Sequence, residues 1–194
     1  MGRKLEFSRE KALHTAMESF WAKGYNHTSM RDLAASLGLH LGSVYNALGD
    51  KEKVFEAAMK LNFEEEILPK IRVLQEAPHP MQAIDDMLHH VVNECTGAEP
   101  GPGCFLVNSL LEIATINDSI TASLRGYLQT VEDMHAEVIA KGQKMGEISK
   151  DHDAAHYARY LIGVYFSMRT MAKLRMPHEY LTAMRDSAIA TLKP

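Results

Sequence analysis

Two glycines near the amino end constrain the fold of this chain most strongly, because each follows a short amphipathic segment. Apolar residues recur at helical spacing from Met30 to Leu37 and again from Leu41 to Leu48. Gly38 and Gly49 follow these segments, and glycine readily takes the left-handed conformation in which many helices end. The sequence therefore predicts two short helices joined by a tight turn. The second helix of such a pair can lie in the major groove of DNA.

Polar residues predict where the neighbouring helices begin. Thr28 can cap the first helix of the pair and Asp50 can cap the helix after it, because a side-chain oxygen can accept a backbone N–H from the first turn. Ser8 precedes another apolar stripe, which predicts an earlier helix of about four turns. We expect Trp21 and Tyr25 to pack this earlier helix against the pair.

The rest of the sequence is helical in pattern, and it shows no period-two strand pattern. A helix that starts at residue 51 connects the head to the body, and Pro69 can only kink or interrupt it. The glutamates at 64–66 indicate a solvated face, and the glycines and prolines within 96–103 predict a loop. We therefore predict an all-α protein of about nine helices. Its N-terminal three-helix, helix-turn-helix domain spans residues 1–50, and a C-terminal helical domain spans residues 51–194.

The composition favours a cytoplasmic globular protein. No run approaches the roughly 20 apolar residues of a membrane-spanning helix, and the mostly charged stretch from Leu5 to Lys11 is not a secretion signal. The two cysteines, Cys95 and Cys104, are too few for a disulfide scaffold, which favours a reducing compartment. We therefore expect a cytoplasmic location and no membrane partner.

Charge is distributed unevenly along the chain. The net charge is −4 overall. Residues 1–60 hold nine Lys/Arg and seven Asp/Glu, a net of +2, whereas the remainder holds twelve and eighteen, a net of −6. A weakly basic head on an acidic body suits a protein that touches DNA at one end only.

The stretch from Thr28 to Lys51, together with the helix before it, resembles the DNA-binding domain of the tetracycline-repressor (TetR) family. The family's pattern is a threonine before a helix, isoleucine or leucine with alanine, Gly-Val-Ser, a short variable stretch, Leu-Tyr, an aromatic residue or histidine with phenylalanine, and a lysine soon after. The matching residues are Thr28, Leu33, Ala34, Gly38, Leu39, Gly42, Val44, Tyr45, Leu48 and Lys51. The chain departs from the pattern at His40, where the family has a serine or threonine cap, and at Ala47, where it often has a residue near a phosphate. Leu48 replaces a common phenylalanine.

The resemblance implies that the second helix of the pair enters the major groove of double-stranded DNA. Ser43 and Asn46 would then face base edges, since serine bonds either base type and asparagine suits adenine. Gly42 would allow a close approach of the helix to the DNA backbone. Contacts to phosphates would fix the register without reading sequence. The expected DNA-binding residues are Thr28, Ser29, Arg31, His40, Leu41, Gly42, Ser43, Tyr45, Asn46 and Lys51.

The last two helices of the chain carry more apolar surface than one small domain can hide. The resemblance implies the same, because TetR-type proteins dimerise through their two C-terminal helices as a four-helix bundle. A two-fold homodimer also suits DNA recognition, because two heads about one helical turn apart can read a palindromic operator.

Methionines and aromatic residues recur in the C-terminal domain. Methionine adapts to irregular apolar shapes, which suits a cavity for a small hydrophobic effector. The same residues would also suit an ordinary core, and the sequence does not separate the two interpretations. The candidate effector-binding or sensing residues are Met87, Cys104, Phe105, Asn108, Tyr127, Met134, Tyr165 and Met168.

Cys104 lies in Gly-Cys-Phe-Leu-Val-Asn, which resembles the Gly-Cys-Leu segment of the TetR branch that includes the repressor of the N-ethylmaleimide reductase gene. In that branch the cysteine can sense electrophiles or oxidants, and a thiolate is favoured at a helix start. The alternative is a small buried thiol. His152 and His156 are four residues apart but lack a third metal ligand nearby, so we interpret them as surface residues. We expect no metal and no cofactor.

The sequence predicts a TetR-type transcriptional regulator, a repressor that a small molecule or an electrophile releases from its operator. One alternative is a helical ligand-binding protein whose DNA-binding head is non-functional, as the departures at His40 and Ala47 would allow. A second alternative is an all-α enzyme. No Ser-His-Asp or paired-carboxylate arrangement has supporting context, so we predict that the protein is not an enzyme.

Overall fold

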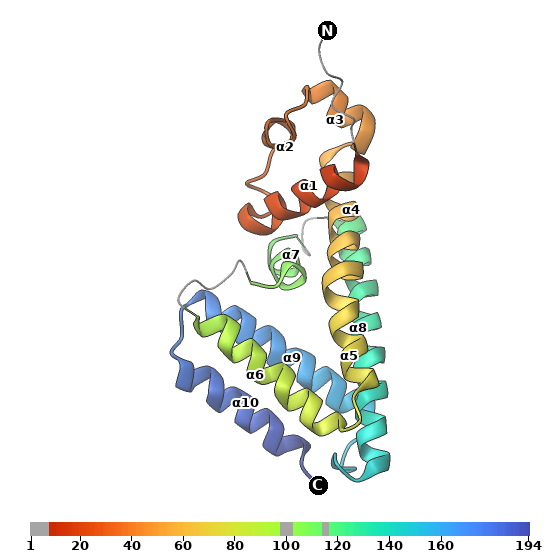
Figure 1. The fold of residues 1–194 in the computed structure, drawn as a ribbon, viewed down its shortest axis with the longest axis vertical. Coiled ribbons are helices and arrows are strands. Elements are labelled where there is room, and N and C mark those ends of the chain that lie inside the picture. The colour runs from red at the N-terminus through yellow and green to blue at the C-terminus, as the bar shows by residue number, and fades with distance from the viewer. Residues whose placement is uncertain (1–7, 98–102, 114–116) are drawn as a thin grey trace.

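The computed structural model describes residues 8–97, 103–113 and 117–194, and every regular element within these ranges is helical. The prediction of an all-α fold is therefore confirmed. A small head at one end stands on a larger body, and a long helical rod runs from one into the other (Figure 1).

The head contains α1 (Arg9–Lys23), α2 (Met30–Leu37) and α3 (Leu41–Leu48). Gly38 ends α2 with φ 64° and ψ 30°, the left-handed conformation that its sequence position predicted. Ser8 and Asp50 cap α1 and the helix after α3 through their side chains, as predicted. The cap of α2 was predicted wrongly. The Ser29 hydroxyl accepts the backbone N–H of Asp32, and the Ser29 backbone N–H donates in return to the Asp32 carboxylate. The Thr28 hydroxyl instead donates backwards to the carbonyl of Gly24 at 2.7 Å.

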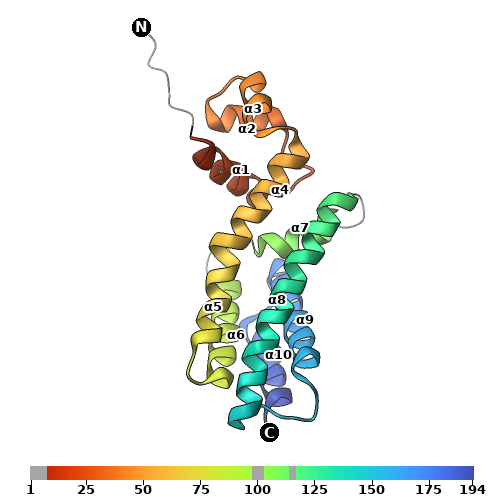
Figure 2. The ribbon, with the colours of Figure 1, turned by 90° about the vertical axis from the view of Figure 1, so that its right-hand side faces the viewer.

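The rod consists of α4 (Lys51–Asn62), a π-helical turn (Phe63–Ile67) and α5 (Leu68–Glu76), which follow one another without a break. Figure 2 shows these segments running from the head along one side of the body. Pro69 lies in the first turn of α5, directly after the π-helical turn, and has no N–H to donate. The predicted kink or interruption therefore takes the form of a change of helical geometry within a continuous rod.

The body contains α6 (Pro80–Thr96), α7 (Phe105–Ile113), α8 (Asp118–Met145), α9 (Ala154–Lys173) and α10 (His178–Leu192). Helices α6, α8, α9 and α10 pack together around an apolar core, and α7 lies between this bundle and the head (Figure 1). The structure describes only the ends of the predicted 96–103 loop, since residues 98–102 lie outside the described ranges. None of the described helices is long and apolar enough to cross a membrane.

The core of the head continues into the body. Phe20 of α1 packs against Phe55 of α4 with ring centroids 4.9 Å apart, and Phe55 packs against Phe105 of α7 at 5.6 Å. Phe20, Phe55 and Phe105 are each at most 3% exposed. The same apolar cluster extends to Ile120 and Leu124 of α8. A shift of α7 would therefore displace side chains in the core of the head, because closely packed interiors transmit displacements.

Polar bonds also join α7 to the head. The Glu112 carboxylate accepts the backbone N–H of Tyr25 at 2.9 Å and that of Asn26 at 2.7 Å. Gly24 has φ 84°, and a Cβ atom at this position would lie 2.6 Å from the Glu112 carboxylate, so the turn requires glycine. Trp21 donates its indole N–H to the carbonyl of Gly103 at 2.8 Å. Trp21 packs against the core cluster that includes residues of α2 and α3, and it also reaches the body.

Replacing Glu112 by alanine should lower the stability of the protein. The variant leaves two backbone N–H groups of the turn after α1 without their charged acceptor, and we expect the free energy of unfolding to fall by about 1–3 kcal/mol. Chemical denaturation measures this change. Glu76→Ala is the matched control, because Glu76 is an exposed glutamate at the end of α5. Equal losses in the two variants would show that the Glu112 bonds contribute nothing.

Candidate functional site

Helix α3 divides sharply into a buried side and an exposed side. Val44 and Leu48 are 0% and 7% exposed and fix the helix to the head. Ser43, Tyr45 and Asn46 are exposed, and around Gly42 a Cβ atom would meet nothing within 4 Å. The outer side of α3 thus presents a hydroxyl, a phenol and a carboxamide around a glycine. These groups can donate and accept hydrogen bonds at a base edge or a phosphate.

The other predicted contact residues differ in how far they are exposed. Ser29, Arg31 and His40 are exposed, whereas Leu41 and Lys51 are half-buried. His40 precedes α3 but makes no side-chain cap bond, which agrees with the departure from the family pattern. The Ser29 hydroxyl donates a hydrogen bond to the Asp32 carboxylate, with 2.6 Å between the two oxygen atoms.

Thr28 does not fit the set of contacts. Its side chain is fully buried, and its hydroxyl is bonded to the Gly24 carbonyl. A buried, satisfied hydroxyl cannot reach a phosphate, so the structure contradicts this prediction. The role of Thr28 is to hold the turn between α1 and α2.

Lys51 lies at the border between the head and the rod. Its ammonium nitrogen sits 4.2 Å from the centroid of the Tyr25 ring, a cation–π contact. Burial lowers the pKa of Lys51, and the Glu112 carboxylate acts in the opposite direction. Lys51 is therefore linked to the same turn that Glu112 holds.

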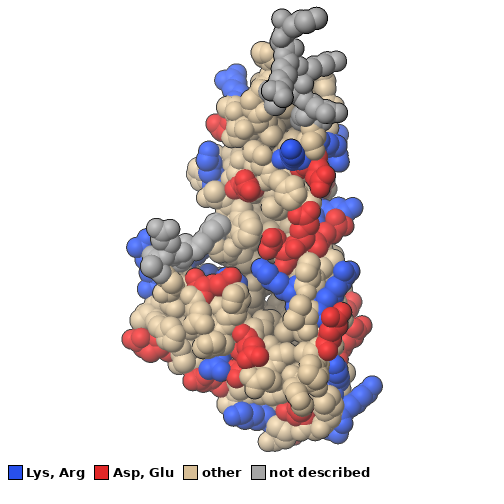
Figure 3. All heavy atoms as spheres, viewed as in Figure 1, with Lys and Arg blue, Asp and Glu red and all other residues tan. Residues whose placement is uncertain are grey.

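A cavity of about 200 Å³ lies between the rod, α6, α7, α8 and α9. Figure 3 shows the surface hollowed below α7, beside the rod. Trp21 of the head also lines this cavity. Four of the predicted effector residues line it as expected, namely Met87, Cys104, Phe105 and Tyr165.

The other four predicted effector residues do not line this cavity. Met168 is fully buried in the body core. Tyr127 packs its ring on Phe63 at 4.5 Å, and Met134 packs in the same small cluster. Asn108 belongs to α7, and its side chain lies beside Gly103, which precedes that helix. Helical periodicity identified these residues as apolar or inward, but it cannot separate core from cavity wall.

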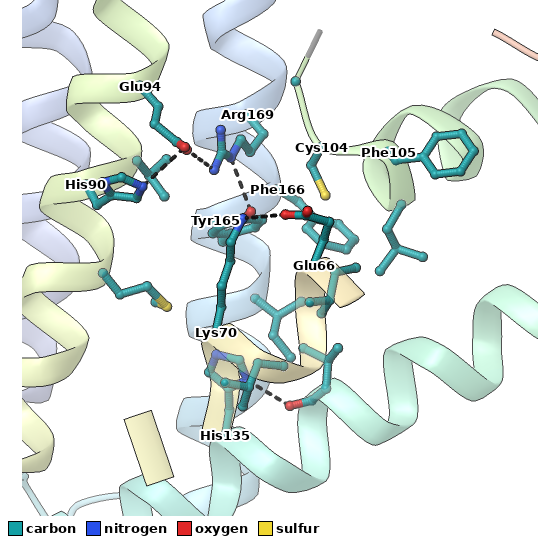
Figure 4. Close-up of a pocket in the computed structure, with 18 of the residues that line it drawn as sticks. Glu66, Lys70, His90, Glu94, Cys104, Phe105, His135, Tyr165, Phe166 and Arg169 are labelled. Carbon is teal, nitrogen blue, oxygen red and sulfur yellow. Dashed lines mark hydrogen bonds and ion pairs between the residues drawn. The ribbon is translucent and has the colours of Figure 1, made fainter. Parts of the chain in front are cut away.

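A polar network at the α6–α9 side of the cavity was not predicted. Arg169 of α9 donates to Glu94 of α6 and, at 3.2 Å, to the phenol oxygen of Tyr165 (Figure 4). His90 lies 3.2 Å from the other oxygen of Glu94. Burial acts to raise the pKa of Glu94, but the hydrogen bond and charge of Arg169 outweigh it and leave that pKa below its usual value. Burial also raises the pKa of Tyr165, which therefore stays a neutral phenol.

The rod adds a second charged pair to the wall. Lys70 lies 3.4 Å from Glu66, four residues earlier in the chain, and both line the cavity (Figure 4). The side chains of Glu64, Glu65 and Glu66 are 53%, 44% and 45% exposed, as predicted for a solvated face, although Glu66 also lines the cavity. The four-residue spacing of Glu66 and Lys70, and of His90 and Glu94, was visible in the sequence. Nothing in the sequence linked Arg169 to either pair.

The two cysteines lie in different surroundings. Cys104 is half-buried on the cavity wall just before α7. Cys95 is buried, and this burial raises the pKa of its thiol. His152 and His156 stack at 4.1 Å on the exposed surface, as expected. Within the described ranges, no three metal-ligating side chains come together.

Comparisons with known proteins match both parts of the chain. The model of the tetracyclin repressor-like C-terminal domain matches residues 80–188, and the model of the tetR family of bacterial regulatory proteins matches residues 12–58. An uncharacterized HTH-type transcriptional regulator of Bacillus subtilis, YezE, is 28% identical over 99% of this chain and 100% of its own length. The HTH-type transcriptional repressor ComR of Escherichia coli is 25% identical over 89% of this chain and 82% of its own.

Solved structures agree with these matches. A cysteine mutant of the TetR family regulator CifR, complexed with a 26-base-pair operator DNA, superposes with a TM-score of 0.83, 26% identity and coverage of 98% and 100% of the two chains. The reduced form of NemR from Escherichia coli has a TM-score of 0.86 at 15% identity, with 96% and 97% covered, which shows a shared fold. The C-terminal match alone spans more than half of the sequence, and the chain therefore belongs to the TetR family of helix-turn-helix transcriptional regulators.

Proposed function

We propose that this protein is a homodimeric cytoplasmic repressor that binds a palindromic operator and leaves it when an effector occupies the cavity. The observation that carries the proposal is the position of Trp21. This residue belongs to the head, yet it lines the cavity of the body and donates to the Gly103 carbonyl. An effector in the cavity would thus contact α1, which belongs to the same head as α3. A coupling of about 1–3 kcal/mol would weaken operator binding roughly five- to 150-fold.

In this proposal α3 reads the operator. Ser43 and Asn46 face base edges, and Gly42 allows the helix to approach the DNA backbone. Tyr45, Arg31, His40 and the ammonium of Lys51 contact phosphates, which fixes the register of the head. The exposure of the outer side of α3 supports this assignment. The likeness to an operator-bound CifR mutant supports it as well.

Tyr45→Phe should weaken binding to every DNA sequence, whereas Asn46→Ala should relax the preference at one base pair of each half-site. Losing the phenol–phosphate bond costs about 1 kcal/mol, or roughly fivefold in affinity. Losing a bidentate base contact costs about 1–3 kcal/mol of discrimination. Operator sequences selected from a random pool, followed by fluorescence anisotropy, measure both effects.

The control for this experiment is Val73→Ala. Val73 is 67% exposed on α5, outside the head and outside the proposed dimer interface. Unchanged affinity in Tyr45→Phe would reject the phosphate contact. Failure of the wild-type protein to select any sequence would favour the alternative, a ligand-binding protein with a non-functional head.

We propose that α9 and α10 form the dimer interface. These adjacent helices present small residues and isolated apolar side chains outward. Leu174, just after α9, is 69% exposed, and Tyr180 of α10 is 41% exposed. Burying such a surface against its own copy would give a four-helix bundle with two-fold symmetry.

Gly163→Arg should convert the dimer into a monomer. Gly163 is exposed on α9, and a Cβ atom there would have no neighbour within 4 Å, so the arginine disturbs only a partner chain. Gly126→Arg is a matched control, because Gly126 of α8 has the same open surroundings. Light scattering after size-exclusion chromatography measures the mass. A dimeric Gly163→Arg protein would place the interface elsewhere.

Cys104 supports an electrophile as a second kind of effector. Its thiol lies on the cavity wall between Gly103, which holds Trp21, and the first residue of α7. A covalent group added to this thiol would occupy the cavity and displace its neighbours.

Iodoacetamide should weaken operator binding of the wild-type protein at least fivefold, and Cys104→Ser should be insensitive to it. Cys95→Ser is the control and should respond like the wild type, because the buried Cys95 thiol has a raised pKa and forms little reactive thiolate. Mass spectrometry of the alkylated peptides and DNA-binding assays measure the two steps. A response that persists in Cys104→Ser would exclude this thiol as the sensor.

A further inference from the structure

The π-helical turn in the rod determines which residues face the cavity. The N–H of Leu68 bonds to the carbonyl of Phe63, five residues earlier. Such π-helical turns are rare in proteins overall, but those that occur are often found at functional sites. Asn62 and Ile71 both line the cavity although nine residues separate them. In a regular α-helix nine residues span about two and a half turns, so the two side chains would point in opposite directions. The wider turn accommodates one more residue and brings both to the same wall.

Asn62 is a buried polar residue on this wall. It is the last residue of α4, directly before the π-helical turn, and it is only 3% exposed. Its carboxamide can donate two hydrogen bonds and accept others. A ligand group that bonds to it would act on the rod at the point where its helical geometry changes.

His135 is the second buried polar residue of the cavity. It is 7% exposed on α8, and its Nδ1 atom lies 2.8 Å from the carbonyl of Val131. Because a carbonyl can only accept, Nδ1 carries the proton. Burial lowers the pKa of His135, so the ring is neutral and its Nε2 atom is an acceptor. A ligand at Nε2 must therefore donate a hydrogen.

The two polar residues lie well apart. Phe63, next to Asn62, packs on Tyr127 of α8, and His135 is eight residues further along that helix, about 12 Å at 1.5 Å per residue. Figure 4 accordingly shows His135 at the end of the cavity away from Phe105 and Cys104. Apolar side chains such as Val131, Leu161 and Phe166 line much of the wall.

We propose that the effector is an elongated, mainly apolar molecule, on the order of 10 Å long. It carries a hydroxyl that donates to Nε2 of His135 and a second polar group that bonds to Asn62 beside the π-helical turn. The hydrogen bond to Asn62 makes α4 respond to an effector in the cavity. The hydrogen bond to His135 contributes only to the affinity for the effector. This inference rests on the proposed function for its effect on DNA, but not for the chemistry of the ligand.

The ligand series biphenyl, 4-phenylphenol and 4,4′-biphenol tests the chemistry, because its members share one rigid body with no, one and two hydroxyls. Calorimetry should show affinity for the wild-type protein rising roughly fivefold with each hydroxyl. Asn62→Leu and His135→Phe should each lose one of these steps, and Met87→Leu, an apolar change on the same wall, should lose none. Equal affinities across the series, or no binding of any member, would overturn the proposed ligand class.

Operator affinity measured with and without saturating 4,4′-biphenol tests the role of Asn62. The wild-type protein and His135→Phe should lose at least fivefold in operator affinity, and Asn62→Leu should lose none although it still binds the ligand. Asn62→Ser repeats the test with a smaller side chain, and thermal unfolding confirms that both variants are folded. An equal loss in Asn62→Leu and Asn62→Ser would overturn the role of the π-helical turn. A wild-type protein that binds no DNA would instead refute the proposed function, and the calorimetric series would still decide the ligand class.

Discussion

One carboxylate holds the turn after α1 against the body, beside the apolar core that the head and the body share. Glu112 projects from α7 and accepts two backbone N–H groups of the turn after α1. A turn of this kind leaves its N–H groups without helical partners, and burying them against α7 would be costly without an acceptor. Gly24 makes the approach possible, because any side chain there would collide with the carboxylate. This contact, the shared apolar core and the rod together fix the head relative to the cavity.

The cavity is consequently shared between the head and the body. Trp21 covers one part of it from α1, while Gly103 and Phe105 at the start of α7 hold that tryptophan in place. Helix α7 thus contacts the cavity at its first residues and the head at Glu112. The rod forms a second connection, because α4 packs against α1 and the π-helical turn faces the cavity. An occupant of the cavity would act on both connections at once.

The local elements of the head were predictable from the sequence. Helix α3 runs from Leu41 to Leu48 as predicted, because glycines bound it and its apolar spacing is clear. The cap of α2 was missed because Thr28 and Ser29 are adjacent hydroxyl residues, and the tertiary structure decides which of them points inward. The contact of Trp21 with the body was also not predicted. An indole on an apolar helix face can pack against any neighbour, and the neighbour lies 82 residues away in the chain.

The sequence by itself determined the helical fold, the helix-turn-helix and the exposed outer side of α3. These features depend on interactions between residues close in the chain, such as caps, glycine ends and apolar spacing. Only the tertiary structure decided where the cavity lies and which residues line it. Periodicity states that a side chain faces inward but not what it meets there. Met168 and Met87 have similar positions in their sequence patterns, yet one fills the core and the other lines the cavity, because the packing of whole helices leaves a space beside only one of them.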